Sequence, residues 1–158
     1  MTADAHPSVA RVAADLRASG ATGTPRMLPA ATRTAAQAAA ALDCDVGAIA
    51  NSLIFDSDGA AVLILTSGSH RVDTAKCAAE IGATSLRRAT PEFVRAHTGQ
   101  PIGGVAPVGH PAPVRTFVDR WLDRHEQVWA AAGHPHSIFA TTYDELLRLT
   151  GGQPIDVE

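Results

Sequence analysis

The sequence predicts an α/β fold of the α+β type, in which helices pack around a mixed β-sheet. Segments with helical apolar spacing alternate along the chain with short apolar runs rich in β-branched residues. Two of those runs, within residues 51–68, flank an Asp-Gly pair and predict a β-hairpin. At 158 residues, with 46% hydrophobic and 18% charged side chains, the chain is large and apolar enough to form one hydrophobic core. We therefore expect a single domain over residues 1–158.

Apolar spacing and capping residues predict five helices. The first carries Val9, Val12, Ala13 and Leu16 on one face, at the spacing that an amphipathic helix requires. Ser, Thr and Asp before a helix, and Gly after it, mark the expected ends. The expected helices are residues 7–19; 35–43, capped by Thr34; 72–81, with Asp73 near its start and Gly82 after it; one that begins at Pro91; and 143–149, with Thr142 or Asp144 near its cap.

The strands follow from apolar, β-branched runs between turn residues. Residues 53–55 and 62–65 form the expected hairpin, with Asp58-Gly59 at its turn. The spacing of apolar residues over 113–122 is ambiguous between helix and strand, and it is compatible with a strand that leads into a short helix. The other expected strands are residues 25–28, 85–87 and 127–133, the last paired with residues 137–142.

Composition excludes several classes of protein. The formal net charge is −3, so we expect neither a broad basic surface nor DNA as a partner, and any RNA contact must be local. Cys44 and Cys77 lack metal-site spacing and fit packed thiols in a reducing compartment. Residues 1–16 lack the pattern of a signal peptide, and no stretch is as long and apolar as a membrane span. These features favour a cytoplasmic protein with no membrane contact.

Residues 100–113, QPIGGVAPVGHPAP, concentrate glycine and proline in one loop. Gly103 and Gly104 can adopt positive φ and direct backbone N–H groups inward, while Pro101 and Pro107 stiffen the flanks. Such N–H groups suit an oxyanion or a substrate carbonyl. The same composition also fits a tight surface connection. The segment has neither the GxxxxGK[ST] nor the GxGxxG pattern of nucleotide-binding loops.

Five segments, taken in order, resemble the YbaK/ProX family, the free-standing relatives of an editing domain inserted in some prolyl-tRNA synthetases. The GGxxPxG loop is the most specific of them. The resemblance runs from about residue 8 to the C-terminus and is strongest over residues 47–152. The segments are IANSLIF (49–55), HRVDTAKCAAEIGA (70–83), IGGVAPVG (102–109), VWAAAGHPH (128–136) and TTYDELLRLTGG (141–152).

The resemblance implies a partly rolled mixed sheet and a trans-editing aminoacyl-tRNA deacylase, which hydrolyses the ester between a small amino acid and the wrong tRNA. It implies no metal and no cofactor. The implied partners are the acceptor end of aminoacyl-tRNA and an aminoacyl-tRNA synthetase. The implied catalytic residues are Asn51, Gly103 and Gly104, and the implied substrate-binding residues are Ser52, Val105, Ala106, Pro107, Gly133 and His134.

Two positions depart from the family pattern. Asn51 stands where members commonly carry lysine, and Ala106 stands where serine is frequent. An amide forms hydrogen bonds but offers no positive charge to a phosphate or ribose oxygen. A non-catalytic binding module for an amino acid, an aminoacyl-tRNA end or a synthetase is therefore the alternative to an enzyme.

Other combinations of residues are weaker candidates. His134 and His136, with His70, His97 and His110 elsewhere, do not match a known metal-ligand spacing. Ser67, Ser69, His70 and Asp73 lack the GxSxG elbow of a hydrolase triad. Trp121 and Trp129 suit core packing better than stacking on an RNA base, and Arg87-Arg88 suits a solvated edge.

Overall fold

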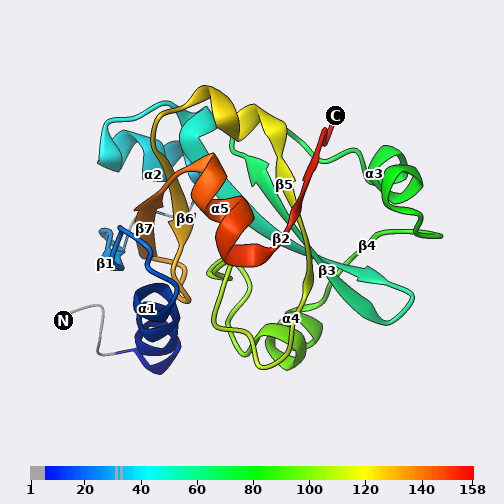
Figure 1. The fold of residues 1–158 in the computed structure, drawn as a ribbon, viewed down its shortest axis with the longest axis horizontal. Coiled ribbons are helices and arrows are strands. Elements are labelled where there is room, and N and C mark those ends of the chain that lie inside the picture. The colour runs from blue at the N-terminus through cyan, green and yellow to red at the C-terminus, as the bar shows by residue number, and fades with distance from the viewer. Residues whose placement is uncertain (1–5, 31, 33) are drawn as a thin grey trace.

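The computed structural model describes residues 6–30, 32 and 34–158. Residues 1–5 belong to the segment 1–16, for which we expect no signal peptide, and they lie outside the described residues. The described residues form one mixed eight-stranded sheet in the order β1-β7-β6-β2-β3-β5-β8, with β4 paired to β2 (Figure 1). The pairs β2–β6, β3–β5 and β5–β8 are parallel and the others are antiparallel. The strands are β1 (Arg26–Met27), β2 (Ile49–Ser57), β3 (Ala60–Ser67), β4 (Arg87–Arg88), β5 (Arg115–Asp119), β6 (Val128–Ala131), β7 (Ser137–Thr141) and β8 (Gln153–Ile155).

The helices begin where the sequence offers capping side chains. Thr34 and Gln37 form a reciprocal capping box, the Asp73 side chain accepts from Lys76 N–H, and Thr142, rather than Asp144, caps the last helix. The helix expected from residue 72 begins at Thr74 because Asp73 is its cap. Among the described residues, the α-helices are α1 (Pro7–Ala18), α2 (Ala35–Leu42), α3 (Thr74–Ile81), α4 (Pro91–Thr98) and α5 (Tyr143–Thr150), and the 3₁₀ helices are η2 (Val46–Ala48) and η3 (Arg120–Arg124).

The expected hairpin is the central pair of the sheet. Asp58 (φ 52°) and Gly59 (φ 92°) both have positive φ, as a tight hairpin turn of this hand requires. The pairing runs from Ser57 opposite Ala60 to Ala50 opposite Ser67. Both strands are longer than the apolar runs alone suggested, because their polar ends also join the ladder.

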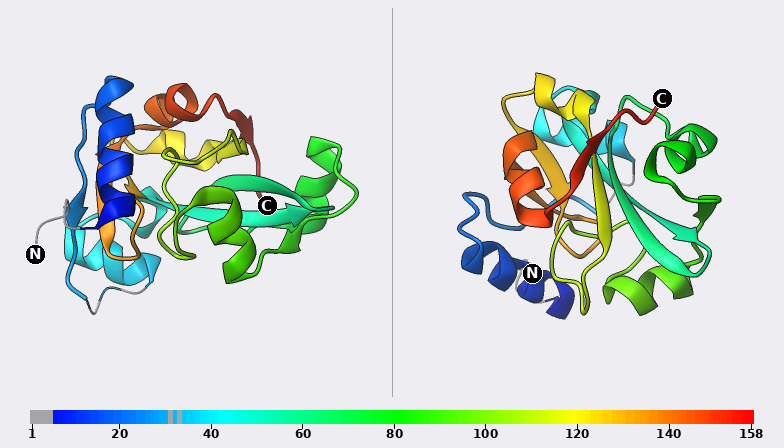
Figure 2. Two further views of the ribbon diagram at one scale, coloured as in Figure 1. Left: turned by 90° about the horizontal axis from the view of Figure 1, so that it is seen from below. Right: turned by 45° about the vertical axis from the view of Figure 1, so that its right-hand side comes forward.

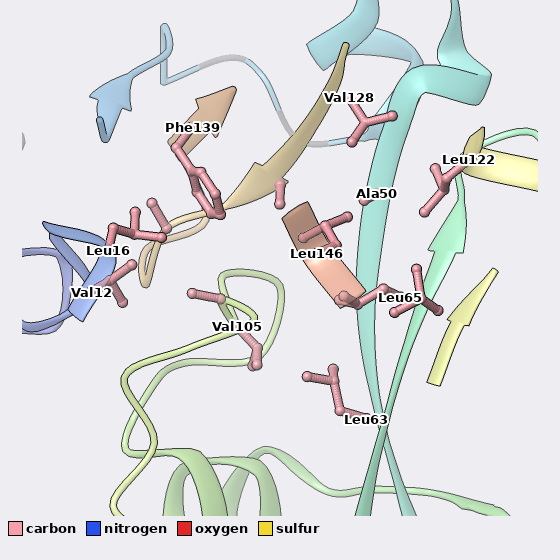
Figure 3. Packing of buried hydrophobic residues seen from close by; sticks show 14 of the residues in the cluster. Val12, Leu16, Ala50, Leu63, Leu65, Val105, Leu122, Val128, Phe139 and Leu146 are labelled. Carbon is pink, nitrogen blue, oxygen red and sulfur yellow. The ribbon is translucent and has the colours of Figure 1, made fainter. Parts of the chain in front are cut away.

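The sheet is buried on both faces, and successive β3 residues face opposite sides. Leu63 and Leu65 belong to one buried cluster with residues of α1, α4 and α5 and with Val105 of the loop that follows α4, and Figure 3 shows Val105, Leu65 and Leu146 in it. Val62 and Ile64 pack instead with α3 and Phe117. In Figure 2, α1 and α3 lie at opposite ends of the molecule, with the central strands of the sheet between them. This frame fixes the position of β2 and of the loop beside it.

Some elements differ from the expectation. Strand β8 was not expected, since Gln153-Pro154-Ile155 is short and polar, and it is held by parallel pairing to β5. Strand β4 is Arg87–Arg88 and not residues 85–87, because its pairing with β2 includes Arg87 and Arg88 alone; Leu86, just before it, is buried. Cys44 and Cys77 are both free thiols, as expected. Within the described residues, the helices are too short and too polar to cross a bilayer.

Candidate functional site

A gap in the strand pairing exposes one edge of β2. Ile49 and Ala50 pair with β6, and Phe55 and Asp56 pair with β4. Between them, residues 51–54 pair only with β3 among the described strands. In an antiparallel ladder, alternate residues direct their N–H and C=O groups away from the partner. Two of these four residues therefore present backbone hydrogen-bonding groups at the gap.

A cavity of about 310 Å³ lies at this gap. Its wall combines β2, β4, the loop after α4, the β6–β7 hairpin and the start of α2, so it joins segments far apart in the sequence. Among the described lining residues, Arg88 is the only charged one. The residues most relevant to chemistry are Asn51, Ser52, Leu53, Arg88, Gly103 and Val105. Four of the residues implied by the resemblance, Asn51, Ser52, Gly103 and Val105, thus meet in one cavity.

Three polar groups of the cavity wall have no partner within the described part of the chain. The Ser52 hydroxyl is buried and forms no hydrogen bond. The exposed amide of Asn51 and the N–H of Gly103 also form none with the described residues. Buried polar groups in folded proteins nearly always have a partner, so the unpaired Ser52 hydroxyl, which is closed to water in this conformation, is an exception at the cavity wall.

The two adjacent glycines of the loop have different roles. Gly103 has φ of 84°, and a Cβ there would meet open space. The Gly104 N–H donates to Pro101 O at 3.0 Å, and its carbonyl accepts from Gly133 N–H at 2.9 Å. A Cβ on Gly104 would collide with the backbone of His134 and lie 2.6 Å from Pro135 N. Our expectation that Gly104 offers a free N–H is therefore wrong for this conformation, because the turn itself uses that group.

The buried side chain of Gln100 anchors the loop through two hydrogen bonds. It is 2% exposed; its Oε1 accepts from Ala106 N–H at 2.7 Å and its Nε2 donates to Val108 O at 3.0 Å. His110 Nε2 donates to the carbonyl of Ala106 at 2.8 Å. Burial lowers the pKa of His110, which favours the neutral ring. No specific signal in the sequence identifies Gln100, since one glutamine in a loop is ordinarily solvated.

The remaining residues implied by the resemblance are not among the described cavity-lining residues. Ala106, Pro107 and Gly133 are buried, and Pro135 reaches the cavity in place of His134. The His134 ring lies 4.3 Å from the His6 ring, and its Nδ1 accepts from His136 N–H at 3.1 Å. Burial, followed by the charges of His6 and His136, lowers the pKa of His134. The lowered pKa favours the neutral His134 ring, and the backbone of His134, not its ring, lies against Gly104 of the loop.

The weaker candidates do not form a second site of the expected kinds. No cluster of three or more metal-ligating side chains exists in the described ranges. His70 Nδ1 hydrogen-bonds Asp119, and not Asp73, at 2.8 Å, and the Ser67 hydroxyl donates to Gly47 O. Trp121 is 44% exposed, with the Arg124 guanidinium 3.8 Å from its ring, so the core position expected for it is wrong. Trp129 is half-buried and lines the cavity.

The chain is similar to several known proteins. A proline–tRNA ligase of Nitratidesulfovibrio vulgaris (strain DP4) is 34% identical over 121 residues, which cover 70% of this chain and 21% of the ligase. The chain thus spans about a fifth of the length of that curated relative. The uncharacterized protein YwhH of Bacillus subtilis (strain 168) is 32% identical over 114 residues, covering 72% of each protein.

Solved structures agree with the fold. A crystal structure described as a candidate trans-editing enzyme for prolyl tRNA synthetase is 44% identical, with a TM-score of 0.91, and the match covers 97% of this chain and 98% of that one. The hypothetical protein APE2540 is 30% identical with a TM-score of 0.83, covering 93% and 98%. The model of the aminoacyl-tRNA editing domain matches residues 29–149, which include β2, the loop and every described cavity-lining residue except Leu28. The chain therefore belongs to the aminoacyl-tRNA editing domain family, of the YbaK/ProX type.

Proposed function

We propose that this chain is a trans-editing deacylase that hydrolyses the ester of a tRNA mischarged with a small amino acid. The observation that carries the proposal is the cavity beside the β2 gap, with the unpaired hydroxyl of Ser52 and the unpaired N–H of Gly103 in its wall. Membership in the editing family supports this substrate class. The fold, one continuous sheet, supports a single functional unit over the chain.

The reaction needs water and a positioned ester. Water attacks the carbonyl carbon, the bond from that carbon to the ribose oxygen breaks, and the ribose oxygen takes a proton, which gives free amino acid and tRNA. In this proposal the Gly103 N–H donates to the carbonyl oxygen as negative charge develops there. Ser52 and Asn51 hydrogen-bond the ribose or the amino acid and fix the ester for attack.

The proposal assigns catalysis to positioning and backbone dipoles. The described cavity wall contains hydrogen-bonding groups and one arginine. Since an aminoacyl ester is already activated, a fixed geometry and one oxyanion donor supply a large part of the rate enhancement. Val105 and Leu53 narrow the cavity beside these groups, which favours a small side chain on the amino acid.

The proposed partners follow from the family and the relatives. We infer that the chain binds the acceptor end of aminoacyl-tRNA in the cytoplasm, where such tRNA is made and used. Similarity to proline–tRNA ligases makes a tRNA for proline the first substrate to test and prolyl-tRNA synthetase the first protein partner.

A binding module is the second candidate, and Asn51 is the observation that favours it. Its uncharged amide lies in the cavity with no partner among the described residues. If wild type binds aminoacyl-tRNA without hydrolysing it, and Asn51→Lys creates hydrolysis, the chain is a binder. If wild type is active and Asn51→Ala loses that activity, it is an enzyme.

A deacylation panel tests the proposed function. Purified wild type is incubated with tRNAs, including one for proline, each charged with alanine, serine, threonine, cysteine or proline, and ester loss is measured against a reaction without protein. We expect protein-dependent loss of at least one small non-cognate amino acid and little loss of proline from its own tRNA. Ester loss at the uncatalysed rate for every pair would reject the deacylase.

A further inference from the structure

The guanidinium group of Arg88 is positioned to contact a bound molecule. It lies in β4, opposite Phe55 of β2, and lines the cavity. Its side chain is exposed and has no ion pair or hydrogen bond with the described residues. Arg87 is its neighbour in the same two-residue strand, but it is opposite Asp56 and does not line the cavity. Successive strand side chains point to opposite faces, so the two arginines differ in direction.

The charge of Arg88 restricts which part of a substrate lies near it. The end of an aminoacyl-tRNA carries an ammonium group on the amino acid and a phosphodiester on the other side of the terminal ribose. Arg88 attracts the phosphodiester and repels the ammonium group. The other described lining residues are uncharged, so no opposing charge in the described wall changes this preference.

We propose, on the basis of the proposed function, that Arg88 binds the phosphodiester next to the terminal ribose and thereby sets the direction in which the substrate enters. The amino acid then extends along β2 toward Ser52 and Asn51. Phe55, the partner of Arg88, is three residues from Ser52, which corresponds to about 10 Å at the rise of a strand. An extended arginine side chain at one end and a ribose with its ester at the other span this length.

An arginine suits this task physically. Its guanidinium stays charged at all working pH values and donates two parallel hydrogen bonds to phosphate oxygens. Because Arg88 binds the phosphate at β4, its positive charge lies away from the ester, which lies beside the uncharged Asn51. Arg88 is therefore a positioning residue: it acts on binding and orientation and not on the reacting bond.

The test compares Arg88→Gln with Arg87→Gln, which removes the same charge from the same strand on the other face. Two substrates are used: the mischarged tRNA and the matching aminoacyl-adenosine, which has the ester and ribose but no phosphate. We expect Arg88→Gln to lower kcat/KM on tRNA by about 10- to 100-fold, mainly through KM, because a hydrogen-bonded charge is lost. Arg87→Gln should stay within about 2-fold of wild type, as surface changes usually do. On aminoacyl-adenosine both variants should equal wild type.

Salt dependence gives an independent readout. Loss of one phosphate contact to single-stranded RNA should make the negative slope of log affinity against log salt shallower by about 0.7 for Arg88→Gln. Arg88→Lys should retain part of the affinity, because it keeps the charge without the paired donors. Unchanged melting temperatures would establish that the variants fold alike.

The outcomes separate this inference from the proposed function. If Arg88→Gln behaves like Arg87→Gln on tRNA, or loses as much activity on aminoacyl-adenosine as on tRNA, the assignment of Arg88 to phosphate is overturned. If wild type hydrolyses neither substrate, the proposed function fails. Arg88 is then judged by binding of an uncharged acceptor-stem RNA, where an unchanged affinity and salt slope in Arg88→Gln would overturn it.

Discussion

The side-chain oxygen of Gln100 accepts a 2.7 Å hydrogen bond from the N–H of Ala106, beneath the glycine-rich loop. The amide nitrogen of the same side chain donates to Val108 O at 3.0 Å. One buried glutamine thus fixes the loop at two points, Ala106 and Val108, which both follow Gly103 in the chain. Because the loop supplies one wall of the cavity, the shape of the cavity depends on this side chain.

Gln100→Ala should lower the free energy of unfolding by about 1 to 3 kcal/mol, since it leaves the buried N–H of Ala106 and the carbonyl of half-buried Val108 without their partner. It should also slow deacylation, because the loop loses its fixed position. Urea unfolding measures the first effect. Gln127→Ala is the control: Gln127 is exposed, and its removal should change stability by less than about 0.5 kcal/mol. Equal stability of the two variants would contradict this role.

Gly104→Ala and Gly103→Ala should have different consequences. The new Cβ at position 104 collides with the His134 backbone, so the loop must shift away from the hairpin that supports it. At position 103 the Cβ enters open space and only the positive φ is unfavourable, which costs about 1 kcal/mol. Thermal unfolding should therefore show the larger loss for Gly104→Ala. A larger loss for Gly103→Ala would mean that the loop packs differently.

Stability should fall on acidification in a way that depends on His110. Burial lowers the pKa of His110 in the folded protein, while Asp15 favours and Arg11 disfavours its charged form. Below the unfolded pKa of about 6.5 the unfolded chain binds the proton more readily, so the free energy of unfolding decreases as pH falls. His110→Gln should reduce the loss between pH 7.5 and pH 5.5, measured by urea unfolding. The part that remains includes His134, whose pKa is lowered too. An identical pH dependence in the variant would exclude His110 as a cause.

Ser52→Ala should separate stability from activity. Its hydroxyl is buried without a partner among the described residues, so its removal should leave the free energy of unfolding unchanged or slightly higher. If the hydroxyl binds substrate, deacylation should fall about 10-fold, the usual loss for one hydrogen bond. Parallel unfolding and kinetic measurements check both statements. A destabilised variant with unchanged kinetics would show that Ser52 has a structural role only.

Local chemistry explains why most of the fold could be predicted. The caps at Thr34, Asp73 and Thr142 and the Asp58-Gly59 turn each depend on a few adjacent residues, and the structure has each of them. Strand β8 could not be predicted in this way, because only its pairing with β5 makes Gln153-Pro154-Ile155 a strand.

The site was less predictable because long-range contacts form it. The resemblance led to Asn51, Ser52, Gly103 and Val105, which line the cavity. The resemblance could not show that the N–H of Gly103 is unpaired while the N–H of Gly104 is paired. This difference depends on a turn in which the Gly104 N–H donates to the Pro101 carbonyl. Arg88 was expected at a solvated edge, and its place in the cavity wall follows from the pairing of β4 with β2.

In the proposed function, the aminoacyl ester is cut in the cavity at the β2 gap. Leu53 lines this cavity and is 37% exposed, so Leu53→Trp can narrow the cavity without entering the core. The most direct measurement is the single-turnover rate of wild type and Leu53→Trp on the mischarged tRNA that the panel identifies. We expect wild type to remove the amino acid and the folded variant to do so at least about 10-fold more slowly, since about 1.4 kcal/mol of lost positioning has that effect. Equal rates for the two proteins would contradict the claim.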